Sequence, residues 1–382
     1  MRNLIILRFI SFLLFGIFLI IGVNLAKLKP LWNDEIYTQT SSVENLSYKK
    51  IIFGKIKEGN NSPFFYLIQK SICDIFRYSL PYEWKGGEID DQKAQILLRM
   101  SSNVFMALSV TIFFYFFSRY YSLGFGIYAL LVALSSFMVW YYWVEARPYS
   151  LWVFLTTVQS LVFLRILKNS SYCLLSWHSL AVINILMAVT SFLSIIQIFI
   201  VSLVLWVFKE KRWKAYLWMT VFPLCLLFFY YFHAPKYKFW IADDGIMPLI
   251  YSSISEMRLV LIITCIVLGG IFYFKKSKVD SIFLGVDVRG YAAFFGFVLV
   301  GTFGVLLWLM WKDSGGLEGF SVTTRYFIYL TPVGIIANVL CLEQLVKIFK
   351  NNFWMVTNII IIFSGIAGIE FVKNSIWFLW AV

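Results

Sequence analysis

The sequence predicts an all-α, polytopic membrane protein with about eleven transmembrane helices. Of its 382 residues, 60% are hydrophobic and only 14% are charged. The mean hydropathy is +0.79. Apolar runs of about 20 residues, the length that crosses a bilayer as a helix, recur along the chain. Soluble globular domains do not have this combination of composition and run length.

The predicted spans follow one another along most of the chain. The first run is about 20 residues long and has no small-residue cleavage site, so we interpret it as an uncleaved span and not as a signal peptide. The eleven predicted spans cover 4–26, 96–117, 123–143, 149–167, 173–190, 192–208, 215–232, 259–274, 291–311, 326–345 and 353–372.

A twelfth apolar segment, 63–80, is predicted to lie in the membrane interface. It contains Gln69, Lys70, Asp74 and Arg77, which makes it too polar for lipid. A helix with one polar face and one apolar face is stable at the boundary between headgroups and acyl chains.

The distribution of basic residues agrees with this choice. With eleven crossings and a cytoplasmic N-terminus, fifteen basic residues fall on the cytoplasmic side: Arg2, Arg8, Arg119, Arg165, Lys168, Lys209, Lys211, Arg212, Lys214, Lys275, Lys276, Lys278, Arg289, Lys347 and Lys350. Seven follow the first loop on the other side: Arg147, Lys236, Lys238, Arg258, Lys312, Arg325 and Lys373. A crossing at 63–80 would invert this bias, against the positive-inside rule.

We therefore expect one integral membrane unit over 1–382. Its first loop, 27–95, would be extracytoplasmic and carry interfacial helices. No soluble domain is predicted after the last span. The unusual polar residues would then all gather on the extracytoplasmic side.

Several classes of function are disfavoured. The net charge of +13 could suggest nucleic acid, but the basic residues lie between apolar runs, as orientation signals do. There is no Walker loop, dinucleotide turn or zinc signature. His178 and His233 are isolated, and we interpret the scattered cysteines as core residues: Cys73, Cys173, Cys225, Cys265 and Cys341.

The clearest functional signal is Asp34-Glu35, which follows the first span in Leu31-Trp32-Asn33-Asp34-Glu35-Ile36-Tyr37. Charge beside a membrane is costly, which favours a functional site. We interpret the two acids as a general base with an auxiliary acid. A simple helix cap is the alternative.

Three further polar motifs are expected on the same side. Arg99 opens the second span and is either a phosphate ligand or an interfacial arginine. Glu145 and Arg147, in Glu145-Ala146-Arg147-Pro148-Tyr149, join two spans and could also be a local ion pair. Arg325 precedes the tenth predicted span, in Thr323-Thr324-Arg325-Tyr326. Asp243-Asp244-Gly245 is interpreted as a turn.

The order of these motifs resembles the C-type polytopic glycosyltransferases. The similarity is to bacterial relatives of dolichyl-phosphate-mannose–protein mannosyltransferases and of the lipid A aminoarabinose transferase. It is strongest over 20–165, and Arg325-Tyr326 with Pro332 resembles a late element of the family. Many relatives have His-Pro-Pro or Lys-Pro-Pro where Asn61-Ser62-Pro63 stands, and many carry a soluble C-terminal domain.

The resemblance implies an inverting hexosyl- or pentosyltransferase whose donor is a polyprenyl-phosphate sugar, in bacteria carried on undecaprenyl phosphate. The acceptor would be an extracytoplasmic glycan, lipid or protein, and the resemblance implies a bacterial inner (plasma) membrane. Asp34, Glu35 and Glu145 would be catalytic. The substrate-binding residues would be Lys85, Arg99, Arg147, Tyr149, Arg325 and Tyr326. No metal ligands are predicted, although paired acids leave a divalent metal possible.

Two other functions remain open from the sequence. An O-antigen-type polymerase or ligase would also join lipid-linked sugars, but we would expect its functional arginines in large late loops. A transporter or flippase would have polar residues and helix breaks at mid-membrane in repeated halves. No internal repeat is visible here.

Overall fold

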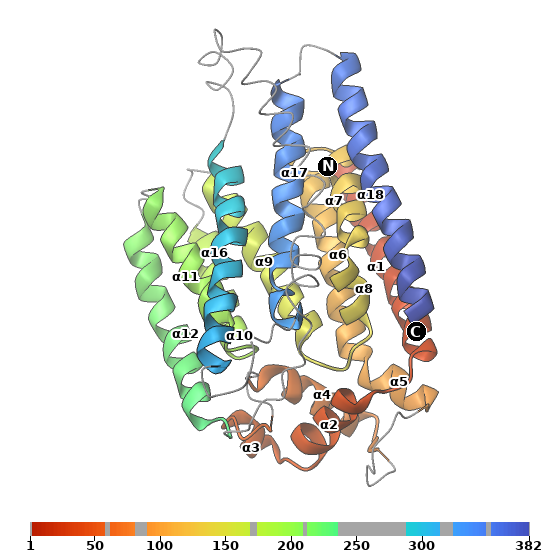
Figure 1. Ribbon diagram of the computed structural model, residues 1–382, viewed down its shortest axis with the longest axis vertical. Helices are drawn as coiled ribbons and strands as arrows, with labels where there is room; N and C mark the ends of the chain where they lie inside the picture. Colours follow the sequence, from red (N-terminus) through yellow and green to blue (C-terminus); the bar gives the residue numbers. More distant parts are fainter. Residues whose placement is uncertain are drawn as a thin grey trace.

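The protein is a bundle of long helices with a group of short helices at one end (Figure 1). The computed structural model describes residues 2–57, 62–80, 90–168, 174–208, 212–235, 288–313, 324–348 and 353–381, and these contain helices and no β-strand. The helices of the bundle are α1 (Arg2–Leu28), α6 (Met100–Tyr120), α7 (Leu123–Ser135), α8 (Phe137–Trp143), α9 (Tyr149–Lys168), α10 (Leu174–Ala188), α11 (Ser194–Val207), α12 (Trp213–His233), α16 (Val288–Asp313), α17 (Leu330–Ile348) and α18 (Phe353–Ala381).

The described helices confirm an all-α protein with many membrane spans. In the described ranges, seven helices are long and apolar enough to cross a bilayer, and α7 with α8 would make an eighth. The helices α10 and α11 also coincide with predicted spans but are shorter, at 15 and 14 residues. The span predicted over 259–274 lies outside the described residues.

One predicted span is broken. The run 123–143 forms α7 and α8, which are bent by 68°. Ser136 has extended backbone, and its hydroxyl accepts a hydrogen bond from the N–H of Val139 at 3.3 Å, which caps α8. The bend lies seven residues before Trp143, where α8 ends, and so redirects the chain that leads to Glu145.

The first span packs closely on the second. A Cβ added to Gly22 of α1 would overlap the side-chain oxygen of Asn103 in α6, so only glycine allows this approach. The Asn103 amide donates to the carbonyl of Leu19 at 3.0 Å, and its oxygen accepts from Trp143 Nε1 at 2.9 Å. Small residues and buried amides of this kind hold helices together in membranes.

Buried polar side chains also join α9 to its neighbours. Gln197 of α11 accepts from Trp152 Nε1 at 2.7 Å and donates to the Thr156 hydroxyl at 2.8 Å. Nearby, Asn184 of α10 bridges Gln159 and the hydroxyl of Tyr216 at 2.8 and 2.9 Å. These contacts connect four helices without exposing polar groups to lipid.

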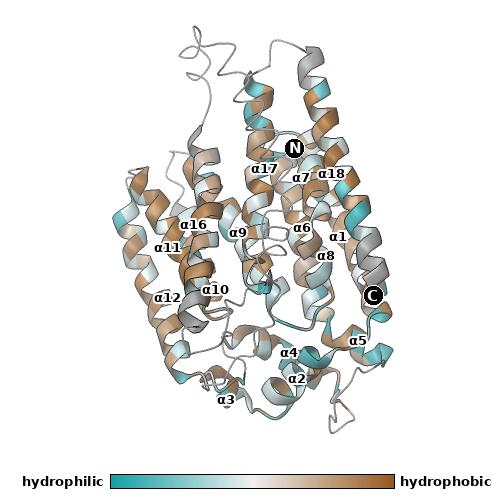
Figure 2. Ribbon diagram, viewed as in Figure 1, coloured by the Kyte–Doolittle hydropathy of each residue, from teal (hydrophilic) through white to brown (hydrophobic). Residues whose placement is uncertain are grey.

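The short helices between the first two spans lie at one end of the bundle, where polar residues increase (Figures 1 and 2). They are α2 (Asn33–Thr38), the π-helix Gln39–Glu44, α3 (Tyr48–Ile52), α4 (Phe64–Ile75) and α5 (Gln92–Leu98). The interfacial helix predicted over 63–80 corresponds to α4, which buries Phe65, Tyr66 and Cys73 beneath it.

The two ends of the chain lie at opposite ends of the bundle. The last turn of α1 contacts Arg99 beside α2, so α1 begins at the far end. The last helix, α18, runs parallel to α7 and α8, with Phe363 against Tyr128 and Phe371 against Trp140, and so ends toward the end of the bundle that carries α2 (Figure 1). An odd number of membrane crossings produces this arrangement.

Candidate active site

Three segments that are far apart in the sequence meet at the end of the bundle that carries α2. They are the first turn of α2, the turn 144–148 between α8 and α9, and the 3-10 helix Thr324–Phe327 that precedes α17. These segments carry six of the nine predicted site residues: Asp34, Glu35, Glu145, Arg147, Arg325 and Tyr326. The predicted shared site is therefore assembled in space.

Glu35 and Arg99 form a fully buried ion pair. Arg99 Nε lies 2.9 Å from Glu35 Oε1, and Arg99 Nη2 lies 2.6 Å from Oε2, with both side chains 0% exposed. The carboxylate also accepts from the backbone N–H of Ala146 at 2.6 Å and of Trp32 at 3.3 Å. Four donors on one carboxylate fix the start of α2 against the turn 144–148.

The remaining donors of Arg99 are directed at the end of α1. Nη1 donates to the carbonyls of Ala26, at 3.1 Å, and of Lys29, and Nη2 donates to Pro30 at 2.8 Å. The last carbonyls of a helix have no partners within it and attract cations, which explains an arginine at this place. All five N–H groups of the guanidinium have acceptors, so we now propose a positioning role for Arg99 in place of phosphate binding.

Asp34 has a different environment from its neighbour Glu35. Its side chain is 40% exposed, and its Oδ2 accepts from Nη1 of Arg147 at 2.7 Å and from Nη1 of Arg325 at 3.1 Å. Arg147 and Arg325 are 11% and 22% exposed. Two cations from separate segments thus converge on one accessible carboxylate oxygen.

Glu145 is the third acid of the site and is almost completely buried. Its Oε1 lies 4.0 Å from Arg147 Nη1, and no described residue donates a hydrogen bond to its Oε2. Burial raises the pKa of Glu145 to about 7, against the opposing effect of Arg147. The Ser102 hydroxyl fixes its backbone by donating to its carbonyl at 2.6 Å. Glu145 can therefore carry or release a proton near neutral pH.

Aromatic rings border the charged groups. The guanidinium of Arg147 lies 5.3 Å from the ring centre of Tyr149, whose ring is 4.7 Å from that of Tyr142. This stacking holds Arg147 over the start of α9. Tyr326 packs its ring at 5.2 Å against Trp308 of α16, so it anchors the segment that carries Arg325.

Sequence reasoning missed Lys29. Its Nζ lies 4.7 Å from the ring centre of Tyr141, and its charge acts on Glu145. Lys29 could have been identified from the sequence because it lies in the short segment between the first predicted span and Asp34. The predicted ligand Lys85 lies outside the described residues.

The site as described has an excess of positive charge. The four basic residues Lys29, Arg99, Arg147 and Arg325 outnumber the three acids Asp34, Glu35 and Glu145. Such an excess favours an anionic ligand, and guanidinium groups suit phosphate. Within the described ranges, no three His, Cys, Asp or Glu side chains gather as a metal site would require.

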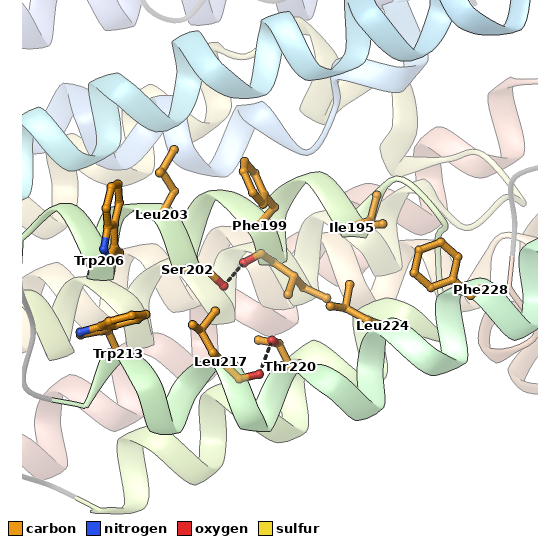
Figure 3. A pocket seen from close by; sticks show the side chains of 11 residues that line it. Ile195, Phe199, Ser202, Leu203, Trp206, Trp213, Leu217, Thr220, Leu224 and Phe228 are labelled. Carbon is orange, nitrogen blue, oxygen red and sulfur yellow. Dashed lines mark hydrogen bonds between the residues drawn. The ribbon is translucent and has the colours of Figure 1, made fainter.

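One described groove lies away from these residues. A cavity of about 490 Å³ between α11 and α12 has a mostly apolar lining and includes none of the predicted site residues (Figure 3). It opens between side chains such as Phe199, Trp206 and Phe228, which are 60%, 56% and 47% exposed. Exposed apolar side chains on outer helices are expected where a protein faces lipid.

Comparison with known proteins identifies the fold. No protein-family model and no curated protein matches the sequence. The crystal structure of ArnT from Cupriavidus metallidurans in the apo state superposes with a TM-score of 0.53 and 11% identity, over 87% of this chain and 59% of the ArnT chain. The chain thus spans about 59% of the length of ArnT. The protein is an integral membrane protein that shares its fold with ArnT, which confirms the predicted all-α, polytopic architecture.

Proposed function

We propose that this protein is a membrane glycosyltransferase that moves a sugar from a polyprenyl-phosphate donor to an acceptor outside the cytoplasm. The observation that carries the proposal is the contact of the accessible Asp34 carboxylate with Arg147 and Arg325. A proton acceptor beside two phosphate-binding cations suits transfer of a sugar away from a phosphate. The fold shared with ArnT, a lipid A aminoarabinose transferase, supports the same reaction class.

The proposed reaction is a direct displacement with inversion. Asp34 accepts the proton of the acceptor hydroxyl as its oxygen attacks the anomeric carbon. The bond between that carbon and the phosphate oxygen breaks, and the lipid phosphate leaves with an added negative charge. Arg147 and Arg325 stabilise that charge because they are already oriented toward the place where it develops.

The remaining site residues have supporting roles in this proposal. Glu35 and Arg99 hold the first turn of α2, which carries Asp34, in register with the turn that carries Arg147. Glu145 orients the acceptor or a sugar hydroxyl through its Oε2, to which no described residue donates a hydrogen bond. Lys85 stays a predicted phosphate ligand, and Tyr149 and Tyr326 support Arg147 and the Arg325 segment.

The location of the site fits a lipid-linked donor. The charged residues lie at the end of the bundle, where the apolar helices stop, so they coincide with the expected headgroup plane. Undecaprenyl phosphate is the carrier we propose, in a bacterial inner membrane with the site on its outer side. Because this chain spans about 59% of ArnT, the acceptor stays open among glycan, lipid and protein.

Radiolabel transfer tests the proposal. Purified protein in nanodiscs would be given undecaprenyl-phosphate sugars with a labelled hexose or pentose, together with an envelope extract as acceptor source. We expect acceptor-dependent transfer of label to a product, with release of undecaprenyl phosphate. Release of label to water alone, or movement of the intact donor across the bilayer without cleavage, would contradict the proposal.

Asp34→Asn is the matched control for that assay. Loss of transfer in this variant would tie the activity to the described site. A polymerase or ligase would instead transfer sugar from a pyrophosphate-linked oligosaccharide, which should be supplied in a parallel reaction.

A further inference from the structure

The ion pair of Glu35 and the ion pairs of Asp34 differ in their freedom to exchange partners. The pair of Glu35 and Arg99 is 0% exposed, and every donor of Arg99 is engaged with protein acceptors. Asp34, Arg147 and Arg325 are 40%, 11% and 22% exposed, so water and ligands can reach them. A ligand that reaches the part-exposed Asp34 can therefore compete with its carboxylate for the two arginines, whereas the Glu35–Arg99 pair is closed to such exchange.

Arg147 and Arg325 both contact the same oxygen of Asp34, each through its Nη1 atom. Nη1 of Arg147 and Nη1 of Arg325 lie 2.7 and 3.1 Å from Asp34 Oδ2. A carboxylate oxygen between two guanidinium groups has the charge and the hydrogen-bonding role of a phosphate oxygen. The substrate-free protein therefore holds an anion of its own at the position where an anionic ligand would bind.

We propose that Asp34 occupies the seat of the donor phosphate in the substrate-free protein and is displaced when the donor binds. This inference rests on the proposed function and adds an order of events to it. The phosphate of the arriving donor takes over the two Nη1 groups. The Asp34 carboxylate turns away from the arginines, and its lone pairs become available to the acceptor hydroxyl.

The charges balance through this exchange and the transfer that follows. The donor is a phosphodiester with one negative charge, and the freed Asp34 has another. During transfer the proton of the acceptor hydroxyl moves to Asp34, while the electron pair of the broken bond between carbon and oxygen stays on the lipid phosphate. Asp34 becomes neutral and the phosphate becomes a dianion, so one negative charge moves from the carboxyl group to the ligand on Arg147 and Arg325.

The same exchange explains how the site empties. When Asp34 loses its proton to water, it regains the charge that attracts it to the two arginines. It then competes with the lipid phosphate for their donors. The residue that accepts the proton would therefore also promote release of the carrier.

The proposal predicts that removing the Asp34 charge strengthens phosphate binding. Wild type, Asp34→Asn and Glu145→Gln would be titrated with undecaprenyl phosphate, and in parallel with inorganic phosphate, at pH 8. We expect Asp34→Asn to bind undecaprenyl phosphate about 5- to 30-fold more tightly, because the Asp34 charge no longer competes for the two arginines. Glu145→Gln also removes one acid, but that acid lies 4.0 Å from the nearest guanidinium nitrogen, so its gain should be several-fold smaller.

A double-variant cycle distinguishes competition from general repulsion. With Arg325→Gln in place, the gain from Asp34→Asn should shrink, because one of the shared donors is gone. Arg325→Lys provides a second background if the glutamine variant is unstable in thermal unfolding. A gain that is equal in all backgrounds would overturn the exchange and leave only long-range repulsion.

The inference and the proposed function fail in different ways. Undecaprenyl phosphate that binds wild type and Asp34→Asn equally would overturn the exchange but leave the proposed donor intact. If neither protein binds it, both proposals are overturned. A gain for inorganic phosphate without any preference for the lipid carrier would support the exchange and contradict the proposed donor.

Discussion

The guanidinium of Arg99 lies against the carboxylate of Glu35 through two hydrogen bonds, of 2.9 and 2.6 Å, with neither side chain exposed. Arg99 also binds the carbonyls at the end of α1, and Glu35 binds the N–H of Ala146. One ion pair therefore connects the first span, the start of α2 and the turn before α9. It determines the spacing between Asp34 and Arg147.

The first prediction is that this pair is needed for stability. Arg99→Gln leaves the Glu35 carboxylate buried without its countercharge, which typically costs about 3–5 kcal/mol. Thermal unfolding in detergent should show a large decrease for Arg99→Gln and a smaller one for Arg99→Lys, which keeps the charge but not the fork. A wild-type melting temperature combined with weak carrier binding would instead support the original assignment of Arg99 to phosphate.

Asp34→Asn is the control for that experiment. Asp34 is 40% exposed, and asparagine keeps an oxygen that can accept from both arginines, so Asp34→Asn should lower the melting temperature less than Arg99→Gln does. The adjacent acids Asp34 and Glu35 should thus differ strongly in their contribution to the stability of the fold.

Much of the fold could be predicted because hydrophobic run length reports directly on membrane crossing. Ten predicted spans coincide with described helices, counting α7 with α8 as one. The bend at Ser136 could not be predicted, because the run 123–143 stays apolar throughout. The break depends on one serine hydroxyl capping α8, and serines occur inside spans without that effect.

The site was predictable as a group of residues but not as a set of contacts. Charge next to membrane spans indicated Asp34, Glu145, Arg147 and Arg325. The partners of Arg99 are backbone carbonyls near the end of α1, which no residue pattern identifies. Sequence spacing also could not show that Arg147 and Arg325 share Asp34, because the two arginines come from distant parts of the chain.

The second prediction concerns the orientation of the bundle. Tyr230, near the end of α12, donates to the carbonyl of Ile52 in α3 at 3.2 Å, whereas Lys214 lies near the start of α12, roughly 24 Å away along the helix axis. In a cysteine-free background, Lys49→Cys and Lys214→Cys would be treated with an impermeant maleimide on spheroplasts. We expect immediate labelling of the first and labelling of the second only after permeabilisation.

Labelling of both cysteines from outside would contradict the spanning arrangement. Labelling of Lys214→Cys alone would invert the orientation and place the site in the cytoplasm. Detergent-solubilised samples provide the control that both cysteines are reactive.

The third prediction follows from the burial of Glu145. Its pKa is about 7 in the folded protein and near 4.5 when unperturbed. Between these values the folded protein keeps a proton that the unfolded chain has lost. Stability should therefore decrease as the pH rises from about 4.5 to 7, by up to about 1.4 kcal/mol per unit, and level off above pH 7.

Glu145→Gln cannot ionise and should lack this dependence. Melting temperatures at pH 5, 6, 7 and 8 would be compared between wild type and this variant. The difference should favour the variant increasingly as the pH rises to 7 and then stay constant. Parallel curves over the whole range would show that Glu145 is not protonated in the folded protein.

The last prediction separates the chemistry of the two adjacent acids. Asp34→Asn keeps the size and much of the hydrogen bonding of the side chain but cannot accept a proton. General bases contribute about 10²–10⁴-fold to rate, so sugar transfer should decrease by that factor while the carrier binds more tightly. Glu35→Gln should lower turnover per folded molecule much less, because Glu35 has four protein donors and no exposed surface and so acts only by positioning Asp34. Turnover per folded molecule, measured on both purified variants at saturating donor, provides the comparison. A larger loss per folded molecule in Glu35→Gln than in Asp34→Asn would identify Glu35 as the base and require its pair with Arg99 to open during the reaction.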